Sequence, residues 1–281
     1  MPIAASAPSS VSDAARIGAL AHRALIDELE AWPKPGLVSP VDSGSHRDMD
    51  AGMLRRSAGA IAPFFPDLVE AGARAAPLSE LRRIGLQAEA AMLAATGGVN
   101  AHRGAIFSLG LICAAAGRFG GKPFPAEALA IQVGDLWGEE IGRRPASPVS
   151  HGGRAALRYG VMGAGAEAAA GFPAVRDFGL PALRRGRRLA PGDVQAARIE
   201  CLFALMAELD DTNLLHRGGP EGLLFARRSA RDFLDAGGVG AADWRDTATT
   251  LHRAFVEARL SPGGAADLLA VTLFLDSLSA S

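Results

Sequence analysis

Residues 33–50 place basic and acidic side chains among prolines and glycines. Lys34 stands between Pro33 and Pro35, which stiffen the backbone around its ammonium group, and Gly36 permits a positive φ or the close approach of a ligand. His46 and Arg47 are further candidate ligands for a phosphate group. Three carboxylates of this stretch could supply oxygen ligands to Mg²⁺: Asp42, Asp48 and Asp50. Asp50 could equally cap the helix that follows.

A second glycine-rich connection, residues 96–104, leads into an apolar helical stretch. Backbone N–H groups at a helix start attract an anion, and basic side chains there add charge-assisted donors. The candidate phosphate ligands are Gly97, Gly98, Asn100, His102 and Arg103. Glu89 shares a helical face with Leu93 and Thr96, so its carboxylate is a candidate catalytic base facing the same cavity; the alternative is an exposed residue of an amphipathic helix.

Residues 208–219 combine three carboxylates with a basic, glycine-containing turn. Acidic groups at the end of a helix oppose its dipole, which a metal ion or Arg217 could compensate. Asp210 is therefore a candidate Mg²⁺ ligand and Asp211 a candidate catalytic base, while Asn213, Arg217 and Gly218 are candidate phosphate ligands. The alternative is that Asp211 caps the next helix and the other carboxylates are solvated.

Two further helix starts complete the set. Ser261, Gly263 and Gly264 could form another anion nest, with Asp267 projecting from the first turn as a candidate metal ligand or as an ordinary dipole partner. His151 precedes two glycines and is a candidate phosphate ligand. We predict that these glycine-rich loops converge on one cleft, because several anion nests beside carboxylates suit a polyphosphate bound through Mg²⁺.

Composition excludes several other classes. The net charge of −1 gives no bulk attraction to nucleic acid or to an anionic membrane, and the apolar runs are too short to span a bilayer. The two cysteines, Cys113 and Cys201, lie in apolar runs, which favours buried thiols in a reducing cytoplasm. The sequence contains no Walker loop, dinucleotide fingerprint, zinc pattern or nucleophile elbow, and His22 and His252 are expected to be surface or core histidines.

The fold is expected to be all-α. Val, Ile and Thr together number 29 of 281 residues, while Ala and Leu dominate, which favours helices over sheet. Residues 1–11 are expected to form a flexible tail and residues 12–281 a single compact helical domain. Helices are predicted near 12–31, 51–72, 79–95, 104–117, 125–140, 153–170, 192–209, 220–236, 241–259 and 265–278. Residues 172–193, with three prolines and the arginine run 184–188, are expected to form a surface loop.

The same segments resemble the triphosphoribosyl-dephospho-coenzyme A synthase family. The similar blocks are PKPGLVSPVDSGSHRDMD (33–50), TGGVNAHRGAIFSLG (96–110), SHGG (150–153), EAAAGFP (167–173), DTNLLHRGG (211–219) and SPGGAADLLA (261–270), in the order of the family. The chain departs from the family at Ala101, Arg103, Gly165 and Ala265, where Thr, Lys, Arg and Ser are usual. Arg103 keeps the charge but changes the donor geometry, and the lost Arg at 165 removes one possible phosphate contact.

The resemblance implies an all-helical, Mg²⁺-dependent transferase that joins ATP to 3'-dephospho-coenzyme A and releases adenine. Its product would pass to a carrier-protein transferase of malonate decarboxylase or citrate lyase. Glu89 or Asp211 would accept the proton of the attacking hydroxyl. Two alternatives stay open: a Mg²⁺-dependent helical glycohydrolase that cleaves an N-ribosyl bond with water, and a nucleotide-binding module without catalysis.

Overall fold

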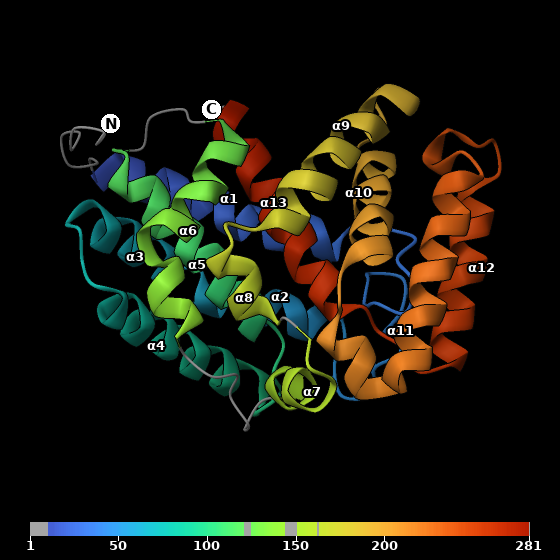
Figure 1. Ribbon diagram of the computed structural model, residues 1–281, viewed down its shortest axis with the longest axis horizontal. Helices are drawn as coiled ribbons and strands as arrows, with labels where there is room; N and C mark the ends of the chain where they lie inside the picture. Colours follow the sequence, from blue (N-terminus) through green and yellow to red (C-terminus); the bar gives the residue numbers. More distant parts are fainter. Residues whose placement is uncertain (1–10, 121–124, 144–150, 162, 281) are drawn as a thin grey trace.

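The computed structural model describes residues 11–120, 125–143, 151–161 and 163–280, and within these ranges it contains helices and no strand (Figure 1). The all-α prediction is confirmed. Val11, which we assigned to the tail, already belongs to the first helix; the remainder of that tail, residues 1–10, lies outside the described ranges. The helices are α1 Val11–Leu29, α2 Ala51–Ile61, α3 Phe64–Ala73, α4 Leu78–Thr96, α5 Arg103–Arg118, α6 Ala126–Gly142, α7 His151–Tyr159, α8 Ala164–Ala169, α9 Leu180–Leu189, α10 Val194–Glu208, α11 Thr212–Asp235, α12 Trp244–Glu257 and α13 Gly263–Ala280, with a π turn at Val175–Gly179 and a 3-10 turn at Gly238–Gly240.

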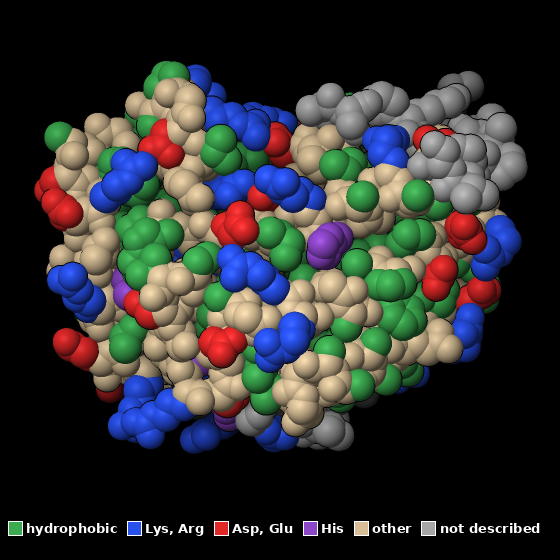
Figure 2. Space-filling model, turned by 180° about the vertical axis from the view of Figure 1, so that it is seen from behind, with side chains coloured by type: hydrophobic (Ala, Val, Ile, Leu, Met, Phe, Trp, Pro, Cys, Tyr) green, Lys and Arg blue, Asp and Glu red, His purple; other side chains and the backbone are tan. Residues whose placement is uncertain are grey.

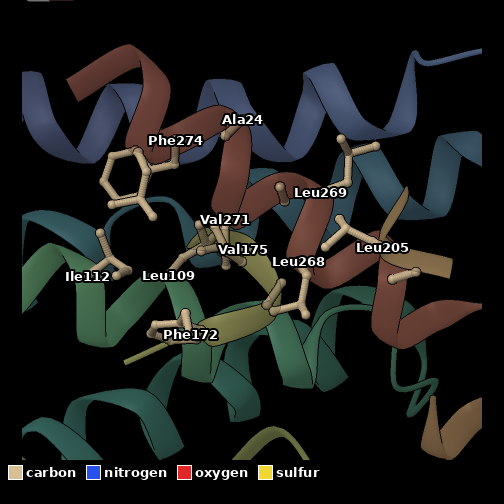
Figure 3. Close-up of a cluster of buried hydrophobic side chains, with 14 of the residues drawn as sticks. Ala24, Leu109, Ile112, Phe172, Val175, Leu205, Leu268, Leu269, Val271 and Phe274 are labelled. Atoms are coloured by element: carbon tan, nitrogen blue, oxygen red, sulfur yellow. The ribbon is translucent and has the colours of Figure 1, made fainter. Parts of the chain in front are cut away.

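Helix α13 forms the centre of the hydrophobic core (Figure 3). Its buried side chains, such as Leu269, Val271 and Phe274, meet Ala24 of α1 and Leu109 of α5. Because α13 is apolar along most of its length, it is largely buried, and α1, α5, α6, α10 and α11 pack against it. Both cysteines are free and buried in this core, as predicted. Burial raises the pKa of the Cys201 thiol to about 12 and that of Cys113 further, so neither is a nucleophile at neutral pH.

The antiparallel neighbours α3 and α5 approach closely because two glycines remove side chains from their contact. A Cβ atom at Gly72 would overlap the carbonyl oxygen of Ala114, and one at Gly117 would overlap the carbonyl oxygen of Val69. Glycine has a low helix propensity, but at these two positions it allows the backbones of the two helices to come into contact. The same contact fixes α5, whose N-terminus carries the candidate residues 102–104.

The predicted helix boundaries fail where proline or glycine divides a periodic stretch. The expected helix 51–72 is two helices, α2 and α3, with the break at Pro63, and the expected helix 153–170 divides into α7 and α8 after Gly160. The expected helix 220–236 is longer: α11 begins at Thr212 and passes through a kink at Gly219, which has φ 61 and ψ −163, directly before Pro220.

The surface loop expected at 172–193 is wrong, because this segment contains α9. Pro181 occupies the first turn of the helix, where a proline needs no N–H partner. The arginine run pairs with acidic side chains of three other helices: Arg184 with Glu127 of α6 at 2.6 Å, Arg185 with Glu200 of α10 at 3.2 Å, and Arg187 with Asp276 of α13 at 2.5 Å. These arginines therefore join helices.

The surface carries both signs of charge. Figure 2 shows basic and acidic side chains interspersed over one face of the molecule, consistent with the net charge of −1. In the part of the chain that the structure describes, none of the helices is long and apolar enough to cross a membrane.

Candidate active site

The 33–50 loop folds as a closed turn against the start of α13 and the end of α12, where it runs as the blue trace beside α11 and α12 in Figure 1. Gly36 has φ +64, and a Cβ atom at this position would overlap the carbonyl oxygen of Leu260. The backbone N–H of Ser45 returns to the Gly36 carbonyl at 3.0 Å. Gly36 is thus required for the close approach of two backbone segments and serves the packing of the loop.

Lys34 points inward from this loop and is fully buried. Its Nζ lies 2.6 Å from the Glu28 backbone oxygen and 2.6 Å from Glu28 Oε1. Burial lowers the pKa of Lys34, while the Glu28 carboxylate opposes that change. The lysine therefore already has an anionic partner inside the protein. Sequence reasoning missed Glu28, because its place in the last turn of an amphipathic helix gives no local signal of this pairing.

His46 points the other way and meets Arg217 of α11. One guanidinium nitrogen of Arg217 donates to His46 Nδ1 at 3.1 Å, and the other donates to the carbonyl oxygens of Ser45 at 3.2 Å and Arg259 at 3.3 Å. His46 Nε2 lies 2.9 Å from the Ser261 hydroxyl. We call Ser45, His46, Arg217 and Ser261 the Arg217 cluster.

The Arg217 cluster keeps its histidine neutral. Burial and the Arg217 charge lower the pKa of His46, although Asp48 lies 3.5 Å from its Nδ1 and opposes the shift. The same guanidinium nitrogen lies 3.1 Å from Nδ1 and 3.3 Å from Nε2, and because a guanidinium can only donate, the neutral ring serves it as the acceptor. Arg47, the next residue, is exposed and has no ion-pair partner among the described residues. With His46 neutral, the Arg217 cluster carries one positive charge, that of the exposed Arg217 side chain.

Asp211 joins the N-termini of two helices. Its Oδ1 accepts from the backbone N–H of Asn213 at 2.8 Å and of Leu214 at 3.3 Å, at the start of α11, and its Oδ2 accepts from Ala265 N at 3.0 Å, at the start of α13. Burial raises the pKa of Asp211, and these backbone donors hold it down. Asp211 thus caps α11, as the alternative interpretation of the sequence predicted. It also caps α13, which the sequence did not indicate.

The glycines beside Asp211 are explained by its closeness. A Cβ atom at Gly264 would lie 3.0 Å from the Asp211 carboxyl carbon, and one at Gly263 would lie 2.9 Å from the side-chain nitrogen of Asn213. The anion nest predicted at 261–264 therefore already contains a carboxylate of the protein. Gly218 lies against Leu260, whose side-chain carbon would be 2.6 Å from an added Cβ atom.

Several polar groups of the turn between α4 and α5 form hydrogen bonds or ion pairs with neighbouring residues of the turn and of α4. Gly97 ends α4 in the left-handed region and Gly98 returns a hydrogen bond to Leu93 at 2.8 Å, both with open space where a side chain would project. Asn100 Oδ1 accepts from the backbone N–H of Arg103 at 3.1 Å, and the Arg103 side chain pairs with Glu89. That ion pair places Glu89 beside this turn, while its role as a catalytic base stays a prediction.

His102 and Asp267 close the N-terminus of α5 from two sides. His102 is buried with Nδ1 2.7 Å from the Ser57 hydroxyl, and burial, together with the charge of Lys34, lowers its pKa to about 4. The Asp267 carboxylate lies so close to Gly104 that a Cβ atom there would overlap it. Burial raises the pKa of Asp267 well above its ordinary value, and the negative charges of Glu28 and Asp211 raise it further.

The remaining candidate metal ligands are separated from one another. Asp42 accepts from His252 Nε2 at 3.1 Å, Asp50 caps α2 through the Met53 N–H at 2.7 Å, Asp210 pairs with Arg227 at 2.8 Å, and Asp48 is exposed beside His46. Within the described ranges, no three His, Cys, Asp or Glu side chains form a group that could hold a metal ion. Asp267 differs from the other candidates because burial and the charges of Glu28 and Asp211 raise its pKa.

The acidic end of α10 is compensated by arginines other than the expected Arg217. Arg227 donates to the Glu208 carbonyl at 2.7 Å and Arg231 to the Ala207 carbonyl at 3.1 Å, so both cap the C-terminal carbonyls of α10. Their side chains also pair with Asp210 and Glu208. Glu208 and Asp210 are thus compensated by arginines, and Asp211 by backbone N–H groups, without a metal ion.

Contacts connect most of the five segments into one region. The 33–50 loop bonds to Arg217 and Ser261, residues 211–213 bond to or pack on 263–265, and residues 102–104 contact Ser57 and Asp267. His151 is the first residue of α7, and its side chain lies outside the description; Gly152 beside it packs on Thr212. The proximity of these loops agrees with our expectation, while a cleft lined by all of them stays a prediction.

Comparison with known proteins identifies the family. The model of the family described as "CitG: ATP:dephospho-CoA triphosphoribosyl transferase" matches residues 14–281. Relatives named probable 2-(5''-triphosphoribosyl)-3'-dephosphocoenzyme-A synthase cover nearly the whole chain: that of Azotobacter vinelandii is 47% identical over 94% of this chain and 92% of its own, and that of Stutzerimonas stutzeri is 43% identical over 99% and 95%. That of Acinetobacter calcoaceticus is 38% identical over 93% and 90%. None of the solved structures matches. The chain therefore belongs to the ATP:dephospho-CoA triphosphoribosyl transferase family and is a transferase.

Proposed function

We propose that this enzyme transfers the triphosphoribosyl group of ATP to the 2'-hydroxyl of 3'-dephospho-coenzyme A and releases adenine. The product would be passed to a carrier-protein transferase, and we favour malonate decarboxylase over citrate lyase as the enzyme that receives the group. The names of the curated relatives support the reaction. The observation that supports it most in this chain is the environment of Arg217.

Arg217 is a positioned cation without a carboxylate partner. Its three closest acceptors are two backbone carbonyls and the neutral His46 ring, and among the described residues no carboxylate lies within ion-pair distance of it. Arg187 and Arg227, by contrast, each pair with an aspartate. Burial of the guanidinium lowers the pKa of Arg217, and only Asp48 opposes this. A phosphate group would supply the missing anion through charge-assisted bonds.

Mg²⁺ fits the surroundings of Asp267 better than those of the other candidates. Mg²⁺ is usually bound by one or two carboxylates together with substrate phosphates, so the Asp267 carboxylate suffices as a ligand from the protein. Burial and the negative charges of Glu28 and Asp211 raise the pKa of Asp267, which indicates that a cation beside it would be stabilising. Bound there with ATP, Mg²⁺ would neutralise charge on the triphosphate. Asp42, Asp50 and Asp210 are already engaged by the protein.

For the proton transfer we favour Glu89 over Asp211. Both Asp211 oxygens accept backbone N–H bonds, which leaves it poorly placed to take up a proton. Glu89 is partly exposed and is oriented by Arg103. In the reaction, the 2'-hydroxyl oxygen bonds to the anomeric carbon of the ATP ribose and its proton goes to the Glu89 carboxylate. The bond to adenine breaks with its electron pair leaving on a ring nitrogen, which takes up a proton from solvent to give neutral adenine, and Glu89 then returns its proton to solvent.

Mass spectrometry of a mixture of the protein, ATP, Mg²⁺ and 3'-dephospho-coenzyme A tests the reaction. The triphosphoribosyl adduct and free adenine should appear in equal amounts. Adenine formed without the acceptor would instead support a glycohydrolase, and ATP binding without adenine under any condition would support a nucleotide-binding module.

The role of Arg217 is tested by substitution. Arg217→Ala should raise the KM for ATP about ten- to a hundredfold, the equivalent of a hydrogen bond to a charged group. Exposed Arg82 on α4 is the matched control, and Arg82→Ala should leave that KM unchanged. An unaltered KM for ATP in Arg217→Ala would refute the anion site.

A further inference from the structure

His252 is a buried histidine of α12 that contacts the 33–50 loop at two points. Its Nδ1 lies 2.5 Å from the backbone oxygen of Lys34 and its Nε2 lies 3.1 Å from Asp42 Oδ2. The ring of Trp32 meets it edge-on with centroids 4.7 Å apart. Both polar contacts are to oxygen atoms, so the ring joins two parts of the loop that are eight residues apart.

Asp42 carries the connection from His252 into a tight turn. Its other oxygen, Oδ1, accepts from the Gly44 N–H at 2.9 Å. Gly44 has φ +54, and a Cβ atom there would lie 2.6 Å from the carbonyl oxygens of Gly36 and Leu37. Asp42 thus holds the turn directly before residues 45 and 46.

The residues that follow this turn belong to the Arg217 cluster. The Ser45 hydroxyl lies 2.6 Å from the Leu260 carbonyl and 3.1 Å from the Phe255 carbonyl, and the Ser45 carbonyl accepts from Arg217. His46 is the nitrogen acceptor of the same guanidinium. Helix α12 lies at one edge of the molecule (Figure 1), where it packs on α11 and the 3-10 turn. Its buried polar side chain His252 is directed at the loop.

We propose that His252 and Asp42 are positioning residues that hold the 33–50 loop so that Ser45 and His46 orient Arg217 toward its anionic substrate. The inference rests on the proposed function, because it takes Arg217 as the phosphate ligand. It also assigns Asp42 to the loop, whereas the sequence favoured a Mg²⁺ ligand at this position. A loop-positioning role of Asp42 predicts a change in ATP affinity on substitution, whereas a metal-binding role predicts a change in the Mg²⁺ requirement.

The experiment measures the KM for ATP, the kcat, the Mg²⁺ concentration for half-maximal rate and the direct affinity for ATP in matched variants. Asp42→Ala and His252→Ala should each raise the KM and the dissociation constant for ATP about tenfold, with a smaller change in kcat and an unchanged Mg²⁺ requirement. The double variant should be no worse than either single one, because both act through one contact. Exposed Arg253, the neighbour of His252 on α12, is the control, and Arg253→Ala should match the wild type.

Conservative variants separate positioning from general stability. Asp42→Asn retains an acceptor oxygen and should restore part of the ATP affinity. His252→Asn places an amide N–H near the position of Nδ1 and keeps the Lys34 contact, whereas His252→Gln reaches toward Asp42. Thermal unfolding of each variant, followed by circular dichroism, identifies those that fold, and His252→Asn and His252→Gln serve if the alanine variant does not.

Three results would overturn the inference. A higher Mg²⁺ requirement in Asp42→Ala but not in the His252 variants would make Asp42 a metal ligand. An unchanged ATP affinity in the Asp42 and His252 variants, with lowered thermal stability alone, would reduce the contact to a structural one, provided that Arg217→Ala does weaken ATP binding. If Arg217→Ala also binds ATP normally, the proposed anion site fails first and the inference fails with it.

Discussion

Removal of the Lys34 charge should destabilise the protein far more than removal of a surface charge. Lys34→Met keeps most of the side-chain volume but leaves the Glu28 carboxylate without its partner in a site where both groups are buried. Arg198, whose charge also acts on Lys34, already pairs with Asp27 at 2.9 Å. Breaking a buried ion pair from one side costs about 3–5 kcal/mol of unfolding free energy. Because m in urea is about 1–3 kcal/mol per molar, the midpoint should fall by roughly 1 M or more.

Urea unfolding at pH 7, followed by circular dichroism, measures this shift. The double variant Lys34→Met/Glu28→Gln should recover most of the loss, because neither charge is then buried alone. Arg74→Met, which removes one side of the exposed pair with Glu80, is the control and should leave the midpoint nearly unchanged. A Lys34→Met protein as stable as the wild type, or a double variant as unstable as the single one, would refute the reasoning.

Three further predictions concern His102, Glu89 and Asp211. The pKa of His102 is about 4 in the folded protein and 6.5 ordinarily, so the unfolded chain binds the proton first as the pH falls. The free energy of unfolding is therefore unaffected by His102 above pH 6.5 and decreases between pH 6.5 and pH 4. Between pH 7 and pH 5 the wild type should lose about 2 kcal/mol more than His102→Asn in urea titrations, and equal losses would contradict this. Glu89→Gln should lower kcat about 10²- to 10⁴-fold with an intact fold, and a wild-type kcat in steady-state assays would exclude Glu89 as the base. Asp211→Asn turns an amide N–H toward backbone N–H groups and should cost about 1–3 kcal/mol in urea unfolding, whereas a wild-type midpoint would show that these bonds contribute little.

The sequence predicts the fold class and several local caps because these depend on neighbouring residues. Asp50 lies three residues before the N–H that it accepts, and Gly97 ends α4 where the periodic pattern stops. At the N-termini of α5 and α13, where the sequence predicted phosphate binding, the structure has carboxyl groups of the protein. These groups, Asp267 and Asp211, are placed there by tertiary contacts across long sequence separations, which no local pattern encodes.

Lys34 and α9 are cases in which the local sequence pattern predicts an exposed segment and the structure shows a packed one. A lysine between two prolines is typical of an exposed turn, but the loop directs it toward Glu28, which a helix of ordinary amphipathic pattern presents. Prolines and four arginines near residue 184 are typical of a solvated loop, yet three of those arginines find acidic partners on other helices and Pro181 begins a helix. In both cases the partner lies on an element whose position only the packed structure fixes.

The central place of α13 has a consequence for the order of events during synthesis. Helices α1, α5 and α10 leave the ribosome earlier than α13, and each contributes apolar side chains that cover it (Figure 3). Until α13 emerges, the apolar side chains of these helices that it covers in the folded protein are exposed, and such surface binds chaperones or aggregates. Late arrival of the innermost helix therefore predicts slow, nearly all-or-none maturation, in which truncation before residue 263 abolishes folding of the entire body.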